Sequence, residues 1–395
     1  MRTRTGVIGG GMIAAALVAS SFAGDLNPPA GPVMPTMKTL QEVEPRIPFD
    51  PADVPIVVNQ SGSYYLTGNF SALVSGQNAI TINADNVTLD LRGFTIRNTE
   101  IGFFNNGVAI ASTAENVRVL NGTIFGCAES GVSGFGARGC AVINVRAMSC
   151  GDQGIILGND ALIQGCTTLD NTLSGIFCGD NSTIENCVAN NNQSGIRAAS
   201  GSTVRGCAAS DNTSVGIIVS GNGVIAQCSA TGNASAGIST GFSSTVTQCS
   251  ARDNTFDGIN VGAGSLVERC TAYSNDRNGI GTSTNCKVLD CAASSNAEHG
   301  IQVSSDALVT GNMCDGNGTA IADGAGVAVT GSDGRIDGNH CTDNDIGFLA
   351  TSTGNLFIRN STKGSPTPFS TVIGNDVATI QASPIGAGPW DNFNF

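Results

Sequence analysis

A pattern that recurs about every 21 residues dominates positions 142–303 of this 395-residue chain. Eight copies can be aligned, and the typical copy has a Gly-Ile pair, a central position, and an Asn five residues further on. The central position holds cysteine in seven consecutive copies: Cys166, Cys187, Cys207, Cys228, Cys249, Cys270 and Cys291. A fixed period of this length is the signature of a solenoid, in which each repeat packs on its neighbours.

Within each repeat the hydrophobic residues alternate with a period of two, as in Ile217 and Val219 or Ile259 and Val261. This spacing is typical of strands, whereas the i, i+3, i+4 spacing of helices is not sustained. One repeat is long enough for three short strands and three corners, which is one coil of a parallel β-helix. The sequence therefore predicts an all-β fold whose coils stack at the strand spacing of ~4.8 Å.

Stacking predicts columns of identical side chains. The asparagines are expected to pass hydrogen bonds along one column: Asn171, Asn192, Asn212, Asn233, Asn254, Asn275 and Asn296. The cysteine column is expected inside, as free thiols that act as small apolar fillers, with Asn312 and Asn339 replacing cysteine in later coils. Cys127, Cys140 and Cys150 lie off this column and are the best candidates for disulfides.

Residues 1–23 are predicted to be a secretory signal peptide, with Arg2 and Arg4 before an apolar stretch and a small-x-small site ending at Ala23. An uncleaved anchor is the alternative. We find no second apolar segment that could span a bilayer as a helix, so the processed chain is not expected to be an integral membrane protein. The predicted location is secreted or cell-surface.

Three further segments are predicted. Residues 24–55 are rich in proline and contain a candidate cap helix starting near Thr39, or else form a linker. Residues 56–363 form the β-helix, and twelve Gly-Ile-type markers from Gly107 to Gly347 plus one or two earlier coils give roughly 12–14 coils. Residues 364–395, with Trp390 and late phenylalanines, are expected to form an aromatic C-terminal cap, or alternatively an exposed platform for glycans.

The formal net charge of −13 and the pI near 4.4 exclude nucleic acid as a partner, because phosphates require basic patches. The same charge disfavours polyanionic glycans unless a divalent cation bridges them, so the cofactor is unknown and calcium stays an open alternative. The sequence has two histidines and no close Cys-x-x-Cys pairs, which gives a structural metal site little support.

The repeat Val/Ile-x-x-Asn/Cys followed by Asn-x-x-x-Gly-Ile resembles the right-handed parallel β-helix superfamily, the pectate-lyase-like fold. Residues 25–32, 38–45, 62–68, 86–93 and 389–393 are more narrowly similar to a group of uncharacterised secreted β-helix proteins of Planctomycetes. The resemblance implies a right-handed fold. It implies no activity, because the paired aspartates, Gly-His-Gly and Arg-x-Lys of relatives with known chemistry are absent.

The best candidate site comes from the turns of three consecutive repeats. Stacking should place Arg252 beside Tyr273, put Arg277 between Phe256 and Glu298, and align Asp257, Asn278 and His299 in one column. Such a group could bind sugar hydroxyls and transfer a proton, or it could be a surface charge network in which each pair contributes about 0–1 kcal/mol. The candidate catalytic residues are Arg252, Asp257, Tyr273, Arg277, Glu298 and His299.

Three functions remain open from the sequence. The first is a non-catalytic β-helix that is structural or binds extracellular polysaccharide. The second is a polysaccharide lyase or glycoside hydrolase that uses the six candidate residues. The third is a metal-linked assembly through the cysteines that lie off the column.

Overall fold

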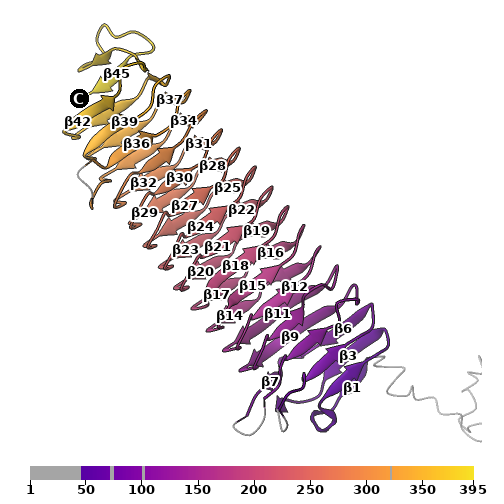
Figure 1. Cartoon of the computed structure of the whole chain (residues 1–395). Coiled ribbons are helices and arrows are strands. Elements are labelled where there is room, and N and C mark those ends of the chain that lie inside the picture. Colours follow the sequence, from indigo (N-terminus) through magenta and orange to yellow (C-terminus); the bar gives the residue numbers. More distant parts are fainter. Residues whose placement is uncertain (1–45, 72–74, 100–102, 321–322) are drawn as a thin grey trace, which may run out of the picture. The chain divides into compact units, whose positions relative to one another are not determined.

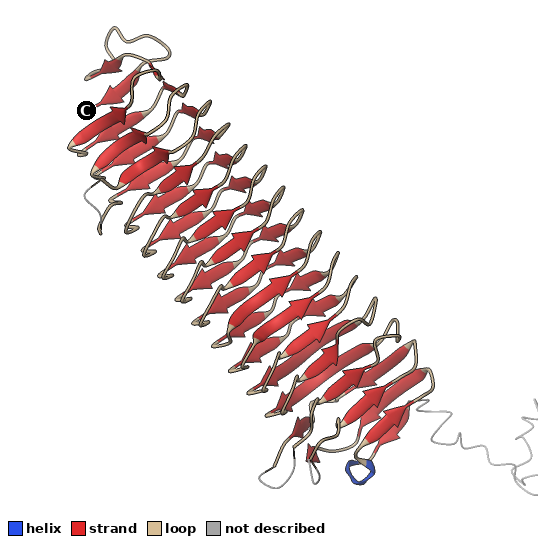
Figure 2. Ribbon diagram, in the orientation of Figure 1, coloured by secondary structure: helices blue, strands red, loops and turns tan. Residues whose placement is uncertain are grey.

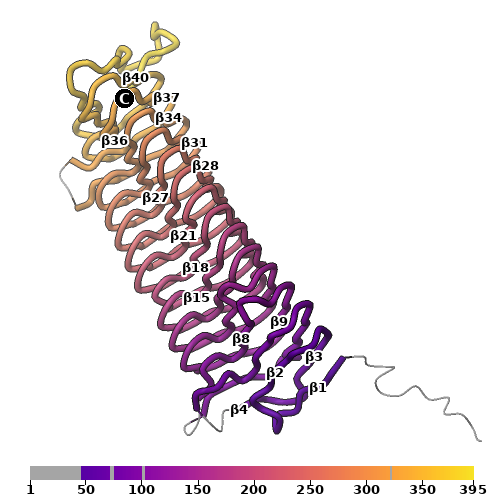
Figure 3. Tube along the Cα trace, turned by 45° about the vertical axis from the view of Figure 1, so that its right-hand side comes forward, coloured from indigo at the N-terminus to yellow at the C-terminus, as the bar shows by residue number. Residues whose placement is uncertain are grey.

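Three short strands, joined by tight corners, make up most coils of the protein (Figures 1 and 2). The computed structural model describes residues 46–71, 75–99, 103–320 and 323–395. The predicted signal peptide and the candidate cap helix lie outside these residues. Within them all the pairings between neighbouring coils are parallel, and the coils follow one another without interruption (Figure 3). The predicted β-helix is therefore confirmed.

The strands form three faces. The first face is a sheet of fifteen strands: β2 (Ile56–Val58), β5 (Ile80–Ile82), β8 (Val108–Ile110), β10 (Val132–Gly134), β12 (Ile155–Leu157), β15 (Ser174–Cys178), β18 (Ser194–Ala198), β21 (Ile217–Val219), β24 (Ile238–Thr240), β27 (Ile259–Val261), β30 (Ile280–Thr282), β33 (Ile301–Val303), β36 (Ala325–Val329), β39 (Ile346–Ala350) and β42 (Thr367–Thr371).

The second face contains β1 (Ile47–Phe49), β3 (Gly62–Leu66), β6 (Val87–Asp90), β9 (Arg118–Phe125), β11 (Ala141–Met148), β13 (Leu162–Gln164), β16 (Thr183–Glu185), β19 (Thr203–Arg205), β22 (Val224–Ala226), β25 (Thr245–Thr247), β28 (Leu266–Glu268), β31 (Lys287–Leu289), β34 (Leu308–Thr310), β37 (Arg335–Asp337), β40 (Leu356–Ile358) and β43 (Asp376–Val377).

The third face contains β4 (Phe70–Ser71), β7 (Thr95–Arg97), the second halves of β9 and β11, β14 (Thr167–Leu169), β17 (Val188–Asn190), β20 (Ala208–Ser210), β23 (Ser229–Thr231), β26 (Ser250–Arg252), β29 (Thr271–Tyr273), β32 (Ala292–Ser294), β35 (Met313–Asp315), β38 (His340–Thr342), β41 (Ser361–Lys363), β44 (Ile380–Gln381) and β45 (Asn392–Asn394). A short 3-10 helix, η1 (Pro51–Asp53), precedes β2.

Among the described residues the stack has fifteen coils, counted on the first face, whereas the glycine markers predicted roughly 12–14. Glycine is needed at the marker because a Cβ on Gly279 would lie 2.6 Å from Nδ2 of Asn296 and 2.7 Å from the carbonyl oxygen of Gly300 in the next coil. The last coil has no coil beyond it on this face, and Pro368 takes the place of the glycine there. Counting glycines therefore misses this coil.

The interior is filled by aliphatic side chains from the three faces and by polar columns at the corners. Asn254 shows how the asparagine column works. Its Nδ2 donates to Oδ1 of Asn275 (2.9 Å) and to the carbonyl of Ala230 (3.2 Å). Its own Oδ1 accepts from the backbone N–H and Nδ2 of Asn233, both at 3.0 Å. The predicted asparagine column is confirmed, and it satisfies main-chain groups at the corner between the third and first faces.

The cysteine column lies at the corner between the second and third faces, and its thiols do more than fill space. Sγ of Cys270 accepts the backbone N–H of Cys249 (3.4 Å), while Sγ of Cys249 donates to the carbonyl of Thr247 (3.2 Å). In the later coils Asn312 takes over, accepting from the N–H of Cys291 at 2.8 Å. The prediction of purely apolar fillers was therefore incomplete, because a thiol can both accept and donate a hydrogen bond.

The three cysteines assigned to positions off the column belong to corner columns as well. Cys150 continues the asparagine column, since its backbone N–H donates to Oδ1 of Asn171 (3.0 Å), and Cys127 lies one coil before it. Cys140 lies in the column of Ser182, at the corner between the first and second faces. All fourteen cysteines fall within the described residues and are free, buried thiols. Cys127, Cys140 and Cys150, which were predicted to be the best candidates for disulfides, are thus free thiols in the corner columns.

We expect Asn254→Ala to lower the free energy of unfolding by about 1–3 kcal/mol, because it leaves buried main-chain and amide groups without partners. Thr255→Ala, which changes the adjacent exposed residue, should stay within about 0.5 kcal/mol of the wild type. Urea unfolding followed by circular dichroism measures both. Equal midpoints for the two variants would show that the column contributes no stability.

Candidate functional site

The six residues predicted as a site lie on three successive coils, and the structure brings them together in three rows. Arg252 is in register with Tyr273 on the third face, as predicted. The guanidinium of Arg252 pairs with the carboxylate of its own neighbour Asp253, Nε to Oδ2 at 2.9 Å. Tyr273 is 52% exposed. This row therefore presents an aromatic ring and a cation on an open sheet surface.

The second row lies in the turn that leaves the third face. The guanidinium carbon of Arg277 lies 5.9 Å from the centre of the Phe256 ring, and its Nε lies 3.5 Å from Oε1 of Glu298. Arg277 therefore lies between Phe256 and Glu298, as predicted. Both charged side chains are partly exposed, so the pair contributes about 0–1 kcal/mol.

The third row is a hydrogen-bonded column, which confirms the predicted alignment. Oδ1 of Asp257 accepts from the backbone N–H and from Nδ2 of Asn278, both at 3.1 Å. Oδ2 of Asp257 accepts from Nδ2 of Asn260 (2.7 Å). Oδ1 of Asn278 accepts from the backbone N–H of His299 (3.2 Å), and Nδ1 of His299 accepts from the backbone N–H of Ala325 (3.0 Å).

The hydrogen bonds of this column determine which side chains are available for proton transfer. Asp257 is buried, and both of its carboxylate oxygens are occupied. His299 accepts a main-chain N–H at Nδ1, so its ring is neutral and carries its proton on Nε2. Burial lowers the pKa of His299, and the carboxylates of Glu298 and Asp323 oppose that shift. The two side chains best suited to proton transfer thus serve as structural acceptors.

The column that contains Tyr273 continues along the third face beyond the predicted site. Its outward residues after Tyr273 are Ser294, Asp315, Thr342 and Lys363, and the parallel outward column runs Thr271, Ala292, Met313, His340 and Ser361. We call the exposed residues Tyr273, Met313, Lys363 and Phe395, together with the half-buried His340, the third-face stripe. The stripe does not follow from the repeat alone, because an insertion after Asp315 breaks the regular period.

The stripe ends in an aromatic cluster at the C-terminal coils. The ring of His340 stacks on that of Phe395 at 6.2 Å, and Nζ of Lys363 lies 5.6 Å from the centre of the same ring. Nδ1 of His340 lies 2.8 Å from Oγ of Ser361. A cavity of about 380 Å³ opens beside Ser361 and Phe395 and is also lined by Ala382, Pro384 and Phe393.

The predicted aromatic cap divides into two parts. Phe369 packs inward, with its ring 4.8 Å from that of Phe348. Trp390 and Phe395 are instead more than half exposed. Phe369 is thus part of the core of the last coil itself, whereas Trp390 and Phe395 are presented to solvent.

Two further findings concern the part of the chain that the structure describes. Among those residues, no three side chains of His, Cys, Asp or Glu are grouped so as to hold a metal ion. The same residues contain no helix with the length and apolar character needed to cross a membrane.

The fold defines the protein as a parallel β-solenoid. The model of the family described as right handed beta helix region matches residues 56–209 and 198–334, more than half of the chain, so the chain belongs to that family. No curated protein matches the sequence. The narrower similarity to the Planctomycetes group stays a prediction.

Two solved structures show the same fold. The A-module of the mannuronan C-5 epimerase AlgE4 of Azotobacter vinelandii superposes with a TM-score of 0.50 and 15% identity, over 80% of this chain and 91% of that one. The Agl-KA catalytic domain superposes with a TM-score of 0.53 and 14% identity, over 83% of this chain and 67% of that one. At these identities the likeness concerns the fold.

The buried acceptor role of His299 predicts a specific pH dependence. Its pKa is lowered in the folded state, so the unfolded chain binds this proton more readily, and stability should fall as the pH drops below about 6.5. His299→Asn, which copies Asn278 in the same column, should lose part of this fall in the thermal midpoint between about pH 7.5 and 5.5. His340→Asn should keep it. An NMR titration that places the His299 pKa above its ordinary value would contradict the assignment.

Proposed function

We propose that this protein is a non-catalytic polysaccharide-binding β-helix that acts outside the cytoplasm, secreted or at the cell surface. The observation that carries the proposal is which side chains are used in the structural column and which are exposed to solvent. The proton-transfer candidates Asp257 and His299 are engaged in a structural column, whereas Tyr273, Met313, Lys363 and Phe395 of the third-face stripe are exposed.

The chemistry of the stripe suits sugars. A sugar ring has a flat apolar face of C–H groups, which packs on aromatic rings such as Tyr273 and Phe395, and an edge of hydroxyls that require donors and acceptors. Lys363 and His340 offer such groups beside Phe395. The parallel strands repeat outward positions at the strand spacing of ~4.8 Å, so a linear polymer can meet equivalent positions in succession.

Two other observations support the proposal. The fold is shared with the A-module of an enzyme named for its action on mannuronan, a polysaccharide. Residues 1–23 have the charge and apolar pattern of a secretory signal, which fits an extracellular glycan as ligand.

A polysaccharide lyase or hydrolase is the second candidate. It is favoured by the partly exposed Arg252, Arg277 and Glu298, which lie on neighbouring coils around Tyr273. In that case Arg277 and Glu298 would act on the substrate without His299 as a base.

We expect the purified chain to bind at least one polysaccharide of a broad panel, tested by affinity electrophoresis with and without calcium, and to release no new reducing or unsaturated ends. Tyr273→Ala should weaken binding about tenfold, because a central exposed aromatic is lost. Phe242→Ala, which removes an exposed ring away from the third face, is the control and should bind like the wild type.

Product release that disappears in Arg277→Ala or Glu298→Ala would establish the enzyme instead. Absence of binding to every polysaccharide in the panel would leave a structural role for the protein and reject the binding proposal.

A further inference from the structure

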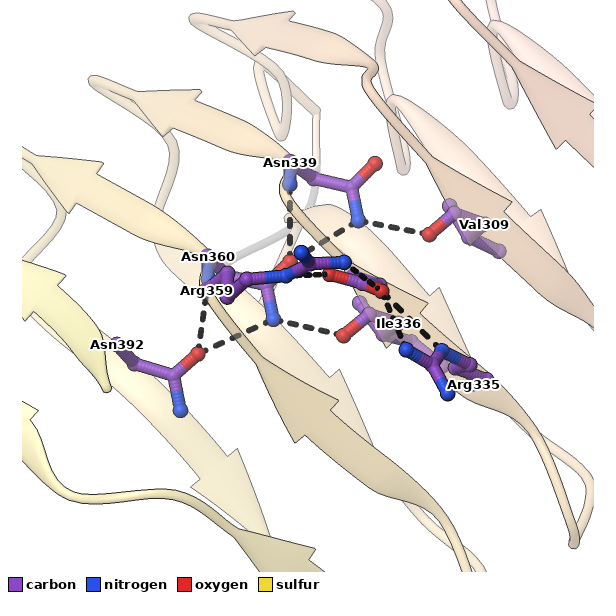
Figure 4. Close-up of polar contacts among 8 residues, drawn as sticks. Val309, Arg335, Ile336, Asn339, Arg359, Asn360 and Asn392 are labelled. Atoms are coloured by element: carbon purple, nitrogen blue, oxygen red, sulfur yellow. Dashed lines mark hydrogen bonds and ion pairs between the residues drawn. The ribbon is translucent and has the colours of Figure 1, made fainter. Parts of the chain in front are cut away.

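A buried carboxylate near the C-terminal end of the stack holds two arginines from neighbouring coils. Asp337 ends β37 on the second face and is 3% exposed, because the side chains around it cover it. Arg335 belongs to the same strand, and Arg359 lies one coil further, at the corner between the second and third faces. Figure 4 shows the side chains of Arg335 and Arg359 converging from neighbouring coils.

Each arginine donates two charge-assisted hydrogen bonds to the carboxylate of Asp337. Nε and Nη2 of Arg335 donate to Oδ2 of Asp337 at 3.1 and 2.8 Å. Nε of Arg359 donates to Oδ1 at 2.7 Å, and its Nη2 donates to Oδ2 at 2.5 Å. The guanidiniums of Arg359 and Arg335 accordingly hold the pKa of Asp337 below its usual range. The carboxylate therefore stays ionised and fixes both guanidiniums at once.

The group keeps unused donors and an excess positive charge. Each guanidinium has five N–H groups, and both use the Nε–Nη2 side for Asp337, which leaves the Nη1 side without a role in this contact. Two cations and one anion leave a charge of +1, and the two arginine side chains are 47% and 48% exposed. One-to-one pairs such as Arg252–Asp253 are neutral and leave no such excess.

Contacts with the C-terminal segment hold the Arg359 guanidinium in place. The guanidinium of Arg359 lies over the ring of Trp390 at 5.4 Å, and its backbone N–H donates to the Trp390 carbonyl at 3.0 Å. The next residue, Asn360, donates from its backbone N–H to Oδ1 of Asn392 at 2.9 Å, which ties the same C-terminal segment to the corner column (Figure 4). Pre-ordered donors lose little entropy when they bind a ligand.

We propose that Arg335 and Arg359, positioned by Asp337, bind an oxyanion substituent of the polysaccharide, a carboxylate or a sulfate. Arginine recognises planar and tetrahedral oxyanions through paired N–H groups. Ser361 follows Arg359 by two residues and begins β41 on the third face, so the pair lies beside the C-terminal end of the third-face stripe. This inference rests on the proposed function and narrows the ligand to an acidic glycan.

The site also qualifies an expectation drawn from the net charge. A chain with a formal charge of −13 disfavours a polyanion over most of its surface. The positive arginine pair is a local exception at one end of the stripe. An acidic glycan would therefore be held at this point directly, without a bridging cation there.

The only tryptophan of the chain, Trp390, reports on the site by fluorescence. We would titrate the full chain with sodium glucuronate and with sodium sulfate, each compared with sodium chloride at equal ionic strength. The expected result is a saturable change in fluorescence with at least one of the two anions and none with chloride. A response to glucuronate alone identifies a carboxylate ligand, and a response to sulfate alone identifies a sulfated one.

Arg335→Gln should weaken this binding by about tenfold, and Arg335→Lys should restore only part of it because lysine keeps the charge but not the fork. Arg138→Gln is the matched control, since it removes one exposed arginine that pairs with Asp160 elsewhere on the chain. The alternative is that the arginine pair only stabilises the C-terminal segment. In that case Arg335→Gln would change the thermal stability, and the wild type would show no fluorescence response to either anion. That result would overturn the proposal.

The two proposals fail separately. If the small anions bind but no polysaccharide does, the arginine site stands and the proposed function falls. If a neutral polysaccharide binds and neither anion changes the fluorescence, the proposed function stands and the arginine site falls. The wild-type titration alone decides the second point, even if an arginine variant does not fold.

Discussion

Side chains that satisfy the main chain at the corners are the constraint on which this β-helix depends. Each coil turns sharply three times, and each turn leaves main-chain N–H and carbonyl groups inside that no strand partner can reach. Asparagine, cysteine and serine occupy the inward corner positions and bond to these groups, as Asn254 does with Asn233 and Ala230. Residues in the left-handed conformation precede them, for example Asp253 and Ser274 with φ near +55°. The coil width is thereby fixed, and so is the period of the sequence.

The same kind of hydrogen-bonded column runs through the candidate site and leaves fewer of its side chains available for catalysis. Asp257, Asn278 and His299 stand in a column, and each provides an acceptor to the next coil. A residue used in this way is held in place but is no longer free to accept a proton from a substrate. The surface available for recognition is therefore the outward side of the strands, where the third-face stripe lies, together with the arginine pair at its C-terminal end.

Most of the fold could be predicted from the sequence, because stacking makes one coil a template for the next. The register of Arg252 with Tyr273 and the position of Arg277 followed directly from the period. What could not be predicted is whether a side chain of a given column points inward or outward at a corner, since this depends on the backbone turn. His299 looked like a free base for that reason. The stripe beyond Tyr273 and the arginine pair were missed because they lie after the insertion that follows Asp315, where the regular repeat no longer aligns. The strands of Arg335 and Asp337 and of the following coil are again 21 residues apart, but the sequence does not show that Arg359 turns toward Asp337.

The proline in the last coil has a consequence for how long such a stack becomes. In inner coils the marker glycine donates its N–H to the coil that follows, as Gly279 does to the carbonyl of His299 at 2.9 Å. Pro368 stands at that position and has no N–H to offer. The terminal edge of the first face is thus poorly suited to pair with another strand, whether that strand comes from the same chain or from a second molecule. A single proline at this edge therefore works against further growth of a fold that is open-ended in principle.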